Sequence, residues 1–93
     1  MKEINMITVK SSQLDAAGYD EEKNELYVEF SSGKIYKYFE VPKRVFDKLI
    51  GPIVSAGSFF HSDIRMKYKY EKFEPDHGEN GDLPSDINLV HNQ

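Results

Sequence analysis

The side chains most suited to binding a ligand are tyrosines and lysines that lie close together in the middle of the chain. Tyr36 and Tyr38 flank Lys37, and Lys34 comes just before them. Tyrosine rings can stack on nucleobases and lysines can contact phosphates, so this stretch predicts a surface for nucleic acid or a nucleotide. The alternative is that both rings belong to the hydrophobic core and only their hydroxyl groups reach its rim.

Further basic residues lie on both sides of a largely apolar segment. Lys43 and Arg44 precede that segment, and Arg65, Lys67 and Lys69 follow it. If the apolar segment folds over the tyrosine-containing strand, these charges could gather on one rim and bind phosphates. The alternative is a solvated mixed surface, on which lysines protect the edge of a sheet from pairing with other chains.

A short run of small residues is the third candidate site. Ser55 and Gly57 lie in it, and their backbone N–H groups and hydroxyls could hold an anion at the start of a helix. The alternative is ordinary helix capping without a ligand. Ser58 and His61 lie one helical turn apart, but no orienting acid or oxyanion hole accompanies them, so we predict no enzymatic activity.

Composition narrows the remaining function classes. The chain has 93 residues and no cysteine, which predicts one domain without disulfides. The three histidines do not show metal-ligand spacing, so we predict neither a metal nor a cofactor. The N-terminus lacks the apolar run of a signal peptide and no stretch is long enough for a membrane span, so we expect a cytoplasmic protein that does not contact membranes.

The segment that positions the tyrosines reads as a β-hairpin. Residues 26–30 alternate apolar and polar side chains, which is the period of a half-buried strand. The loop 31–33 ends in Gly33, and a three-residue hairpin loop places a left-handed residue at that position. The sequence therefore predicts a hairpin that turns at 31–33.

The loop length decides which face the tyrosines occupy. A three-residue loop pairs Phe30 with Lys34 and Val28 with Tyr36, which puts both tyrosines on the face of Val28. A two-residue loop would pair Phe30 with Ile35 instead and would send both tyrosines to the other face. We favour the three-residue loop because of the position of its glycine.

The elements around the hairpin follow from apolar spacing and from the positions of proline and glycine. We expect strands at about 4–10 and 13–19, and a helix at 43–50 that starts after a proline. A second helix is expected to begin with Ser58 as its N-cap and to run to about Arg65. Residues 66–73 alternate again and predict either a closing strand or an extended arm.

Together these elements predict an α+β domain over residues 4–73. Its antiparallel sheet of four or five strands would be covered on one face by the helical segment 43–65. Residues 74–93 contain five acids and no lysine or arginine, and we expect them to form a disordered tail. Deleting 76–93 should then leave the melting temperature nearly unchanged, although 86–90 form a weak candidate docking motif.

Several short motifs follow one another in a fixed order over about residues 8–70. They are Val9-Lys10-Ser11-Ser12, Gly18-Tyr19-Asp20, Leu26-Tyr27-Val28-Glu29-Phe30, Gly33, Tyr36-Lys37-Tyr38, Val41-Pro42, Ser55-Ala56-Gly57-Ser58-Phe59-Phe60 and Ile64-Arg65. This ordered set resembles the KTSC domain family, which is named for a module at the C-terminus of some lysyl-tRNA synthetases and also occurs as free-standing small proteins. The resemblance implies no catalytic residues, and the synthetase context suggests RNA binding.

The function expected from the sequence is therefore a small non-enzymatic binding module for RNA or another nucleic acid. The charge distribution agrees with it, because residues 34–73 carry nine basic side chains and four acids while the whole chain has a net charge of −4. One alternative is a binder of a small phosphorylated or nucleotide ligand, with a pocket at an oligomer interface. Another is a protein–protein adaptor that uses the acidic tail.

Overall fold

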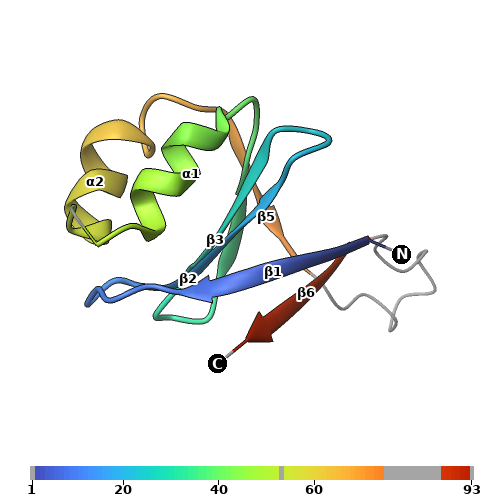
Figure 1. Cartoon of the computed structure of the whole chain (residues 1–93), viewed down its shortest axis with the longest axis horizontal. Coiled ribbons are helices and arrows are strands. Elements are labelled where there is room, and N and C mark those ends of the chain that lie inside the picture. The colour runs from blue at the N-terminus through green and yellow to red at the C-terminus, as the bar shows by residue number, and fades with distance from the viewer. Residues whose placement is uncertain (1, 53, 75–86, 93) are drawn as a thin grey trace.

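The computed structural model describes residues 2–52, 54–74 and 87–92. They form an α+β domain with two helices and a curled six-stranded sheet, in the order β5-β4-β3-β2-β1-β6 (Figure 1). The elements are β1 (Lys2–Thr8), β2 (Leu14–Asp20), β3 (Glu25–Phe30), β4 (Ile35–Tyr38), α1 (Lys43–Ile50), α2 (Ala56–Asp63), β5 (Tyr70–Phe73) and β6 (Ile87–Asn92). None of the helices in the described ranges is long and apolar enough to cross a membrane.

The predicted fold class is confirmed, but the sheet is larger than expected and is mixed. We predicted four or five antiparallel strands, whereas β6 adds a sixth that pairs with β1 in parallel. The prediction of disorder for 74–93 is therefore wrong for 87–92, while 75–86 lie outside the described residues. The acidic composition of the whole segment concealed the alternation of Ile87 and Leu89, which suits an edge strand.

The central hairpin has the predicted register. Val28 pairs with Tyr36 and Leu26 pairs with Tyr38 across β3 and β4. The backbone N–H of Phe30 donates to the carbonyl of Lys34 at 2.9 Å, which closes a three-residue loop. Gly33 ends that loop with φ = +95°, in the left-handed region that favours glycine. The alternative two-residue loop is wrong.

The first predicted helix is confirmed, and the second begins earlier than expected. α1 spans 43–50, as predicted from the proline before it and its apolar stripe. α2 starts at Ala56 with Ser55 at the N-cap, so Ser58 is not the cap. A Cβ on Gly57 would lie 2.9 Å from Oγ of Ser11, so glycine lets this first helical turn lie close to the β1–β2 loop.

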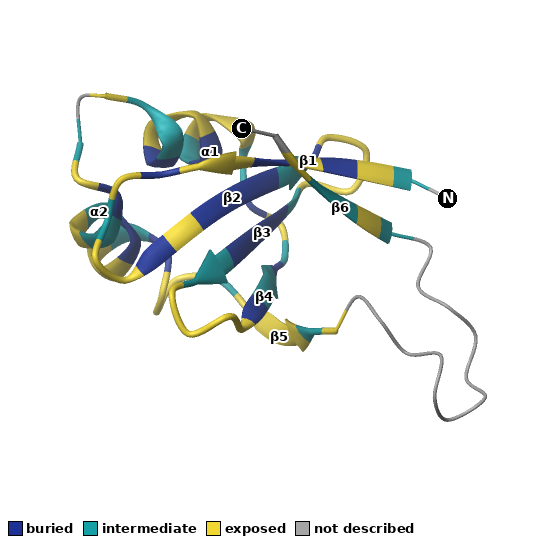
Figure 2. Ribbon diagram, turned by 90° about the horizontal axis from the view of Figure 1, so that it is seen from below, coloured by how far each residue is buried: buried dark blue, intermediate teal, exposed yellow. Residues whose placement is uncertain are grey.

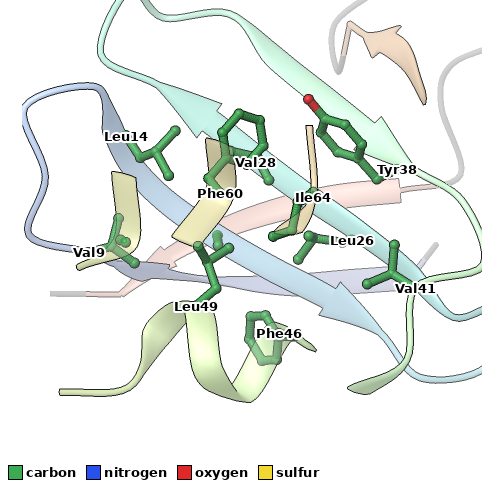
Figure 3. Close-up of a cluster of buried hydrophobic side chains, with 12 residues drawn as sticks. Val9, Leu14, Leu26, Val28, Tyr38, Val41, Phe46, Leu49, Phe60 and Ile64 are labelled. Atoms are coloured by element: carbon green, nitrogen blue, oxygen red, sulfur yellow. The ribbon is translucent and has the colours of Figure 1, made fainter. Parts of the chain in front are cut away.

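The main hydrophobic core lies between the helices and one face of the sheet. Leu26 and Val28 from β3 meet Phe46 and Leu49 from α1, with Phe60 of α2 beside them (Figure 3). These side chains come from the alternate positions of strands and from the apolar stripe of each helix, as the sequence periods require. This layer holds β4 and α2 in fixed positions next to each other.

The other face of the sheet is buried too, which we did not predict. Ile4, Met6, Ala16 and Tyr27 form a second core there, and Phe73 from β5 packs against it together with Ile87 and Leu89 from β6. The central strand β2 is consequently buried along most of its length, and β3 is buried at three of its six positions and half-buried at the others (Figure 2). The ring of Tyr27 meets the edge of Phe73 at 5.1 Å between centroids.

Close approach of β1 and β2 allows this second core to form. A Cβ on Gly18 would lie 2.7 Å from side-chain atoms of both Ile4 and Met6 and 2.9 Å from the carbonyl oxygen of Asn5. No other residue could occupy this position without moving β1, because one of the obstructing atoms belongs to its backbone. Glycine at this position therefore lets the sheet curl over the second core.

The turn between β2 and β3 is anchored by a buried carboxylate. Asp20 is fully buried, and its Oδ1 accepts a hydrogen bond from the backbone N–H of Glu22 at 3.0 Å. The ammonium of Lys2 lies 2.7 Å from the same oxygen. Burial alone would raise the pKa of Asp20, but the bonds from Lys2 and the turn N–H groups outweigh it, so the pKa is lower than usual.

Candidate functional site

A cleft of about 590 Å³ opens beside β4, at the end of α2. It lies on the helix side of the sheet, and its walls come from the β3–β4 hairpin, α2, the segment after α2 and β5. Clefts of this size suit a small organic ligand or one nucleotide. Its lining residues are Gln13, Phe30, Ser31, Ser32, Lys34, Tyr36, Tyr38, Phe60, His61, Arg65, Met66 and Tyr70.

Five aromatic rings in mutual contact line this cleft. Tyr70 lies 5.6 Å from Tyr36 and 5.5 Å from Tyr38, measured between ring centroids. Phe30 contacts Tyr36, and Phe60 contacts both Phe30 and Tyr38, all at 5.4–5.7 Å in edge-to-face geometry. The contacts close a cycle, so each ring is held by two others. Such a wall offers apolar, polarisable surface to a planar ligand.

The tyrosines differ in how much of the ring a ligand could reach. Tyr38 is only 3% exposed, so the expectation that its ring belongs to the core is correct for this residue. Burial, with smaller effects of Tyr70 and Tyr36, raises the pKa of Tyr38 to about 12. Tyr36 is half-buried, whereas Tyr70 is 56% exposed on the edge strand. Tyr70 is therefore the ring most open to stacking.

Two cations stand at the rim of the cleft. Lys34 comes from the end of the hairpin loop and Arg65 from the segment that follows α2, and both are exposed. Within the described residues neither forms an ion pair, and no acid lines the cleft. Of the two predicted basic groups, only this pair lines the cleft, and both charges are available to an anion.

A hydrogen-bonded chain holds Arg65 at the rim. Nη1 of Arg65 lies 3.4 Å from Nδ1 of His61, and Nε2 of His61 lies 2.5 Å from Oε1 of Gln13. Arginine can only donate, so Nδ1 accepts and Nε2 carries the hydrogen that is donated to Gln13. His61 thus links Gln13 to Arg65, and it positions Arg65 rather than activating a serine.

Lys67 and Lys69 lie next to the cleft rather than inside it. They line a shallow depression that shares Met66 and Tyr70 with the cleft. A turn at 64–67 and a bend at 68 precede β5, which spans only 70–73, so the predicted strand is shorter at its start. The two lysines can extend the positive rim outward past Tyr70.

The structure places Lys37 away from the cleft. It projects from β4 to the opposite face, where its Nζ lies 3.7 Å from carboxylates of both Glu25 and Glu71. It also lies 5.3 Å from the ring centre of Phe39. Alternation along β4 sends Lys37 and the two flanking tyrosines to different faces, so the three do not form one surface.

Lys43 and Arg44 are also remote from the cleft, on exposed positions of α1. The ammonium of Lys43 lies 3.1 Å from Asp47, one helical turn away, and this pairing raises the pKa of Lys43. Ser55 and Gly57 belong to the start of α2 and do not line the cleft. Ser55 makes no side-chain capping hydrogen bond there.

Sequence reasoning missed Gln13, Phe60, His61 and Tyr70 as cleft residues. Tyr70 could have been proposed from the sequence, since it belongs to a Tyr-Lys-Tyr motif like the one at 36–38. Nothing in the sequence around Gln13 points to the cleft, because only the packing of the β1–β2 loop against α2 brings Gln13 to His61. Within the described ranges no group of three or more histidine, aspartate or glutamate residues could hold a metal ion.

Comparison with protein families gives one match that covers most of the domain. Residues 10–68 match the KTSC domain. The chain is also similar to a KTSC domain protein from Yersinia pestis of known crystal structure, with a TM-score of 0.71 and 30% sequence identity. That likeness covers 76% of this chain and 99% of the Yersinia chain.

Two kinds of curated relative appear. A protein of Stutzerimonas stutzeri is 46% identical over 69 residues, which are 73% of this chain and 96% of that protein. A lysine–tRNA ligase of Trichormus variabilis is 41% identical over 54 residues, which are 58% of this chain but only 9% of the ligase. The similarity to the ligase is thus confined to a small segment of that enzyme.

Proposed function

The chain belongs to the KTSC domain family, and from that premise and the cleft geometry we propose that it is a non-enzymatic module that binds single-stranded RNA or another nucleic acid. In this proposal a base stacks on Tyr70 beside Tyr36, and neighbouring phosphates meet Arg65 and Lys34. The rings supply sequence-tolerant stacking, and the cations supply electrostatic attraction.

The observation that carries the proposal is the meeting of an exposed ring with unpaired cations. Tyr70 is 56% exposed and lines the same cleft as Lys34 and Arg65. Lys37, Lys43 and Lys72, by contrast, are each within 4 Å of an acid. Positive charge without acidic partners is therefore found beside the accessible ring, where a phosphate next to a stacked base would lie.

The similarity to a segment of lysine–tRNA ligases supports the same proposal. Those ligases act on tRNA as whole enzymes, and the matching segment is 9% of the Trichormus ligase. A small domain attached to such an enzyme would be useful if it bound RNA. The position of the candidate cleft on the domain surface fits that use.

A second candidate ligand is a free nucleotide or another small phosphorylated compound. The cleft volume of about 590 Å³ favours this small ligand, because the space accommodates one nucleotide and not a longer nucleic-acid strand. The two candidates differ in their contacts outside the cleft. A nucleic-acid strand would also contact Lys67 and Lys69 beyond Tyr70, whereas a free nucleotide would not.

The test compares two double variants that remove the same charge. Lys34→Ser with Arg65→Ser removes the rim cations, and Lys43→Ser with Arg44→Ser is the matched control on α1. Single-stranded binding changes with a slope of about −0.7 per phosphate contact when log affinity is plotted against log salt. We expect the slope for a short RNA to flatten by up to ~1.4 in the rim variant and to stay the same in the control.

Equal slopes in both variants would contradict the proposed RNA site. Binding of a nucleoside monophosphate as tight as that of an oligonucleotide, with loss in the rim variant alone, would favour the small-ligand candidate. Absence of any RNA or DNA binding by the wild-type protein at low salt, where attraction is strongest, would rule out the nucleic-acid proposal.

A further inference from the structure

We propose that the outer edge of β1 is a docking site for an extended peptide strand, and that residues 87–92 are its resident occupant in this chain. The site lies on the opposite face of the sheet from the cleft and does not rest on the proposed RNA binding. β-strand addition of this kind obtains affinity from backbone hydrogen bonds and specificity from alternate side chains.

The pairing of β6 with β1 is continuous. Six residue pairs run in parallel register, from Lys2 opposite Ile87 to Ile7 opposite Asn92. Figure 1 shows β6 alongside β1, and β6 is the last strand of the sheet that the described residues form. Without β6, the outward backbone groups of β1 would form an open edge, which is a template for another strand.

Alternate side chains of β6 pack against the second core. Ile87 and Leu89 pack against the cluster built by Ile4, Met6 and Tyr27. These side chains lie on one side of β6 because residues two apart share a face. The apolar face beneath them therefore selects a strand with apolar residues at its first and third positions.

A polar contact fixes the fifth position of the strand. Nε2 of His91 lies 2.5 Å from Oε1 of Glu29, which is on β3 and only 20% exposed in its side chain. The imidazole thus reaches across the curled sheet to a carboxylate on the same face as the second core. A histidine or a basic residue at this position would satisfy Glu29.

The comparisons indicate that the shared KTSC domain does not need the whole of this chain. The KTSC match covers residues 10–68, so β6 lies outside it, as do β1 and β5. The Stutzerimonas and Yersinia relatives are matched over 96% and 99% of their own length, yet account for only 73% and 76% of this chain. The shared fold is thus nearly complete in those relatives without a counterpart for about a quarter of this chain.

The inferred partner is a peptide with the pattern of β6: apolar, any, apolar, any, then histidine or a basic residue. In the intact chain it would compete with β6, which is tethered through residues 75–86. Short tethers give effective concentrations on the order of millimolar, so an external peptide should bind the wild-type protein poorly.

The test measures a labelled six-residue peptide with the sequence of 87–92 against two full-length proteins by fluorescence anisotropy. One is wild type, and the other carries Ile87→Asp and Leu89→Asp, which should release β6 from the edge. We expect the peptide to bind the double variant at least ~10-fold more tightly than wild type, because the tethered competitor is lost. A control peptide with residues 88 and 89 exchanged places an apolar side chain on the wrong face and should not bind.

Equal binding to both proteins, or no binding to a double variant that still melts cooperatively, would overturn the proposal. If the double variant does not fold, a protease site within 75–86 of the otherwise unchanged chain provides the second arm. After cleavage of the folded protein, the β6 fragment should remain associated and be displaced by excess unlabelled peptide. Loss of the fragment on cleavage, without rebinding, would also overturn it.

Discussion

Replacing Tyr70 by alanine should separate a role in binding from a role in folding. Tyr70 lies on the edge strand β5 and is 56% exposed, whereas the adjacent Tyr38 is only 3% exposed. Both rings line the cleft, so either change could affect a ligand. Only the change at Tyr70 should do so without removing buried core.

The two substitutions should lower the free energy of unfolding by clearly different amounts. Tyr70 contacts Tyr36 and Tyr38, and aromatic pairs contribute ~0.5–1.5 kcal/mol each beyond area burial, less when exposed. Tyr70→Ala should therefore lower the free energy of unfolding by about 1 kcal/mol, whereas Tyr38→Ala should cost ~3–5 kcal/mol, as for other large buried aromatics. A lost stacking platform costs ~1–3 kcal/mol of binding, or roughly a 5- to 150-fold weaker affinity.

The assay is fluorescence anisotropy with a short labelled RNA, combined with urea unfolding of the same samples. Tyr70→Phe keeps the ring and removes only the hydroxyl, so its affinity should stay within about twofold of wild type if stacking dominates. Wild-type affinity in a folded Tyr70→Ala protein would refute the stacking role. A large drop in affinity for Tyr70→Phe as well would show that the hydroxyl, not the ring, makes the contact.

Two further predictions concern stability. Gly33→Val should lower the free energy of unfolding by roughly 1–2 kcal/mol, because Gly33 has φ = +95° and a valine there strains the backbone. An added Cβ would meet open space, so steric clashes do not contribute. An unchanged urea midpoint would contradict this prediction. Asp20 has a lowered pKa on folding, so its contribution is present above about pH 4 and is lost as pH falls through the folded value. The Asp20→Asn protein should therefore be less stable than wild type at pH 7, and the gap in urea midpoints should narrow by pH 3.

The hairpin and first helix could be predicted because their signals are local. Gly33 at the third loop position set the register, and that register placed Tyr36 and Tyr38 on the helix side. A proline followed by apolar residues at helical spacing marked α1. In each case a backbone constraint and a side-chain period agree within a few neighbouring residues, so no long-range information is needed.

The second core and β6 could not be predicted, because they depend on contacts between distant segments. Tyr27 alternates with Leu26 and Val28 and therefore looks like the outer side of a half-buried strand, until Phe73 packs against it. The candidate site shows the same limit. Arg65 was predicted as a phosphate contact from its charge alone. The hydrogen bonds that hold it run through His61 to Gln13, and His61 and Gln13 are 48 residues apart in the sequence, so local patterns could not reveal them.

The two proposed binding surfaces use opposite faces of the sheet at its opposite edges. Alternation in β3 and β4 sends Val28, Tyr36 and Tyr38 to the helix side, and Tyr27 and Lys37 to the other. The cleft is bounded by the edge strand β5, whereas the docking edge is β1. Changes at the cleft rim should therefore leave peptide docking intact, and changes in β6 should leave the RNA salt slope intact, because separated sites act additively. Each proposal can fail without the other.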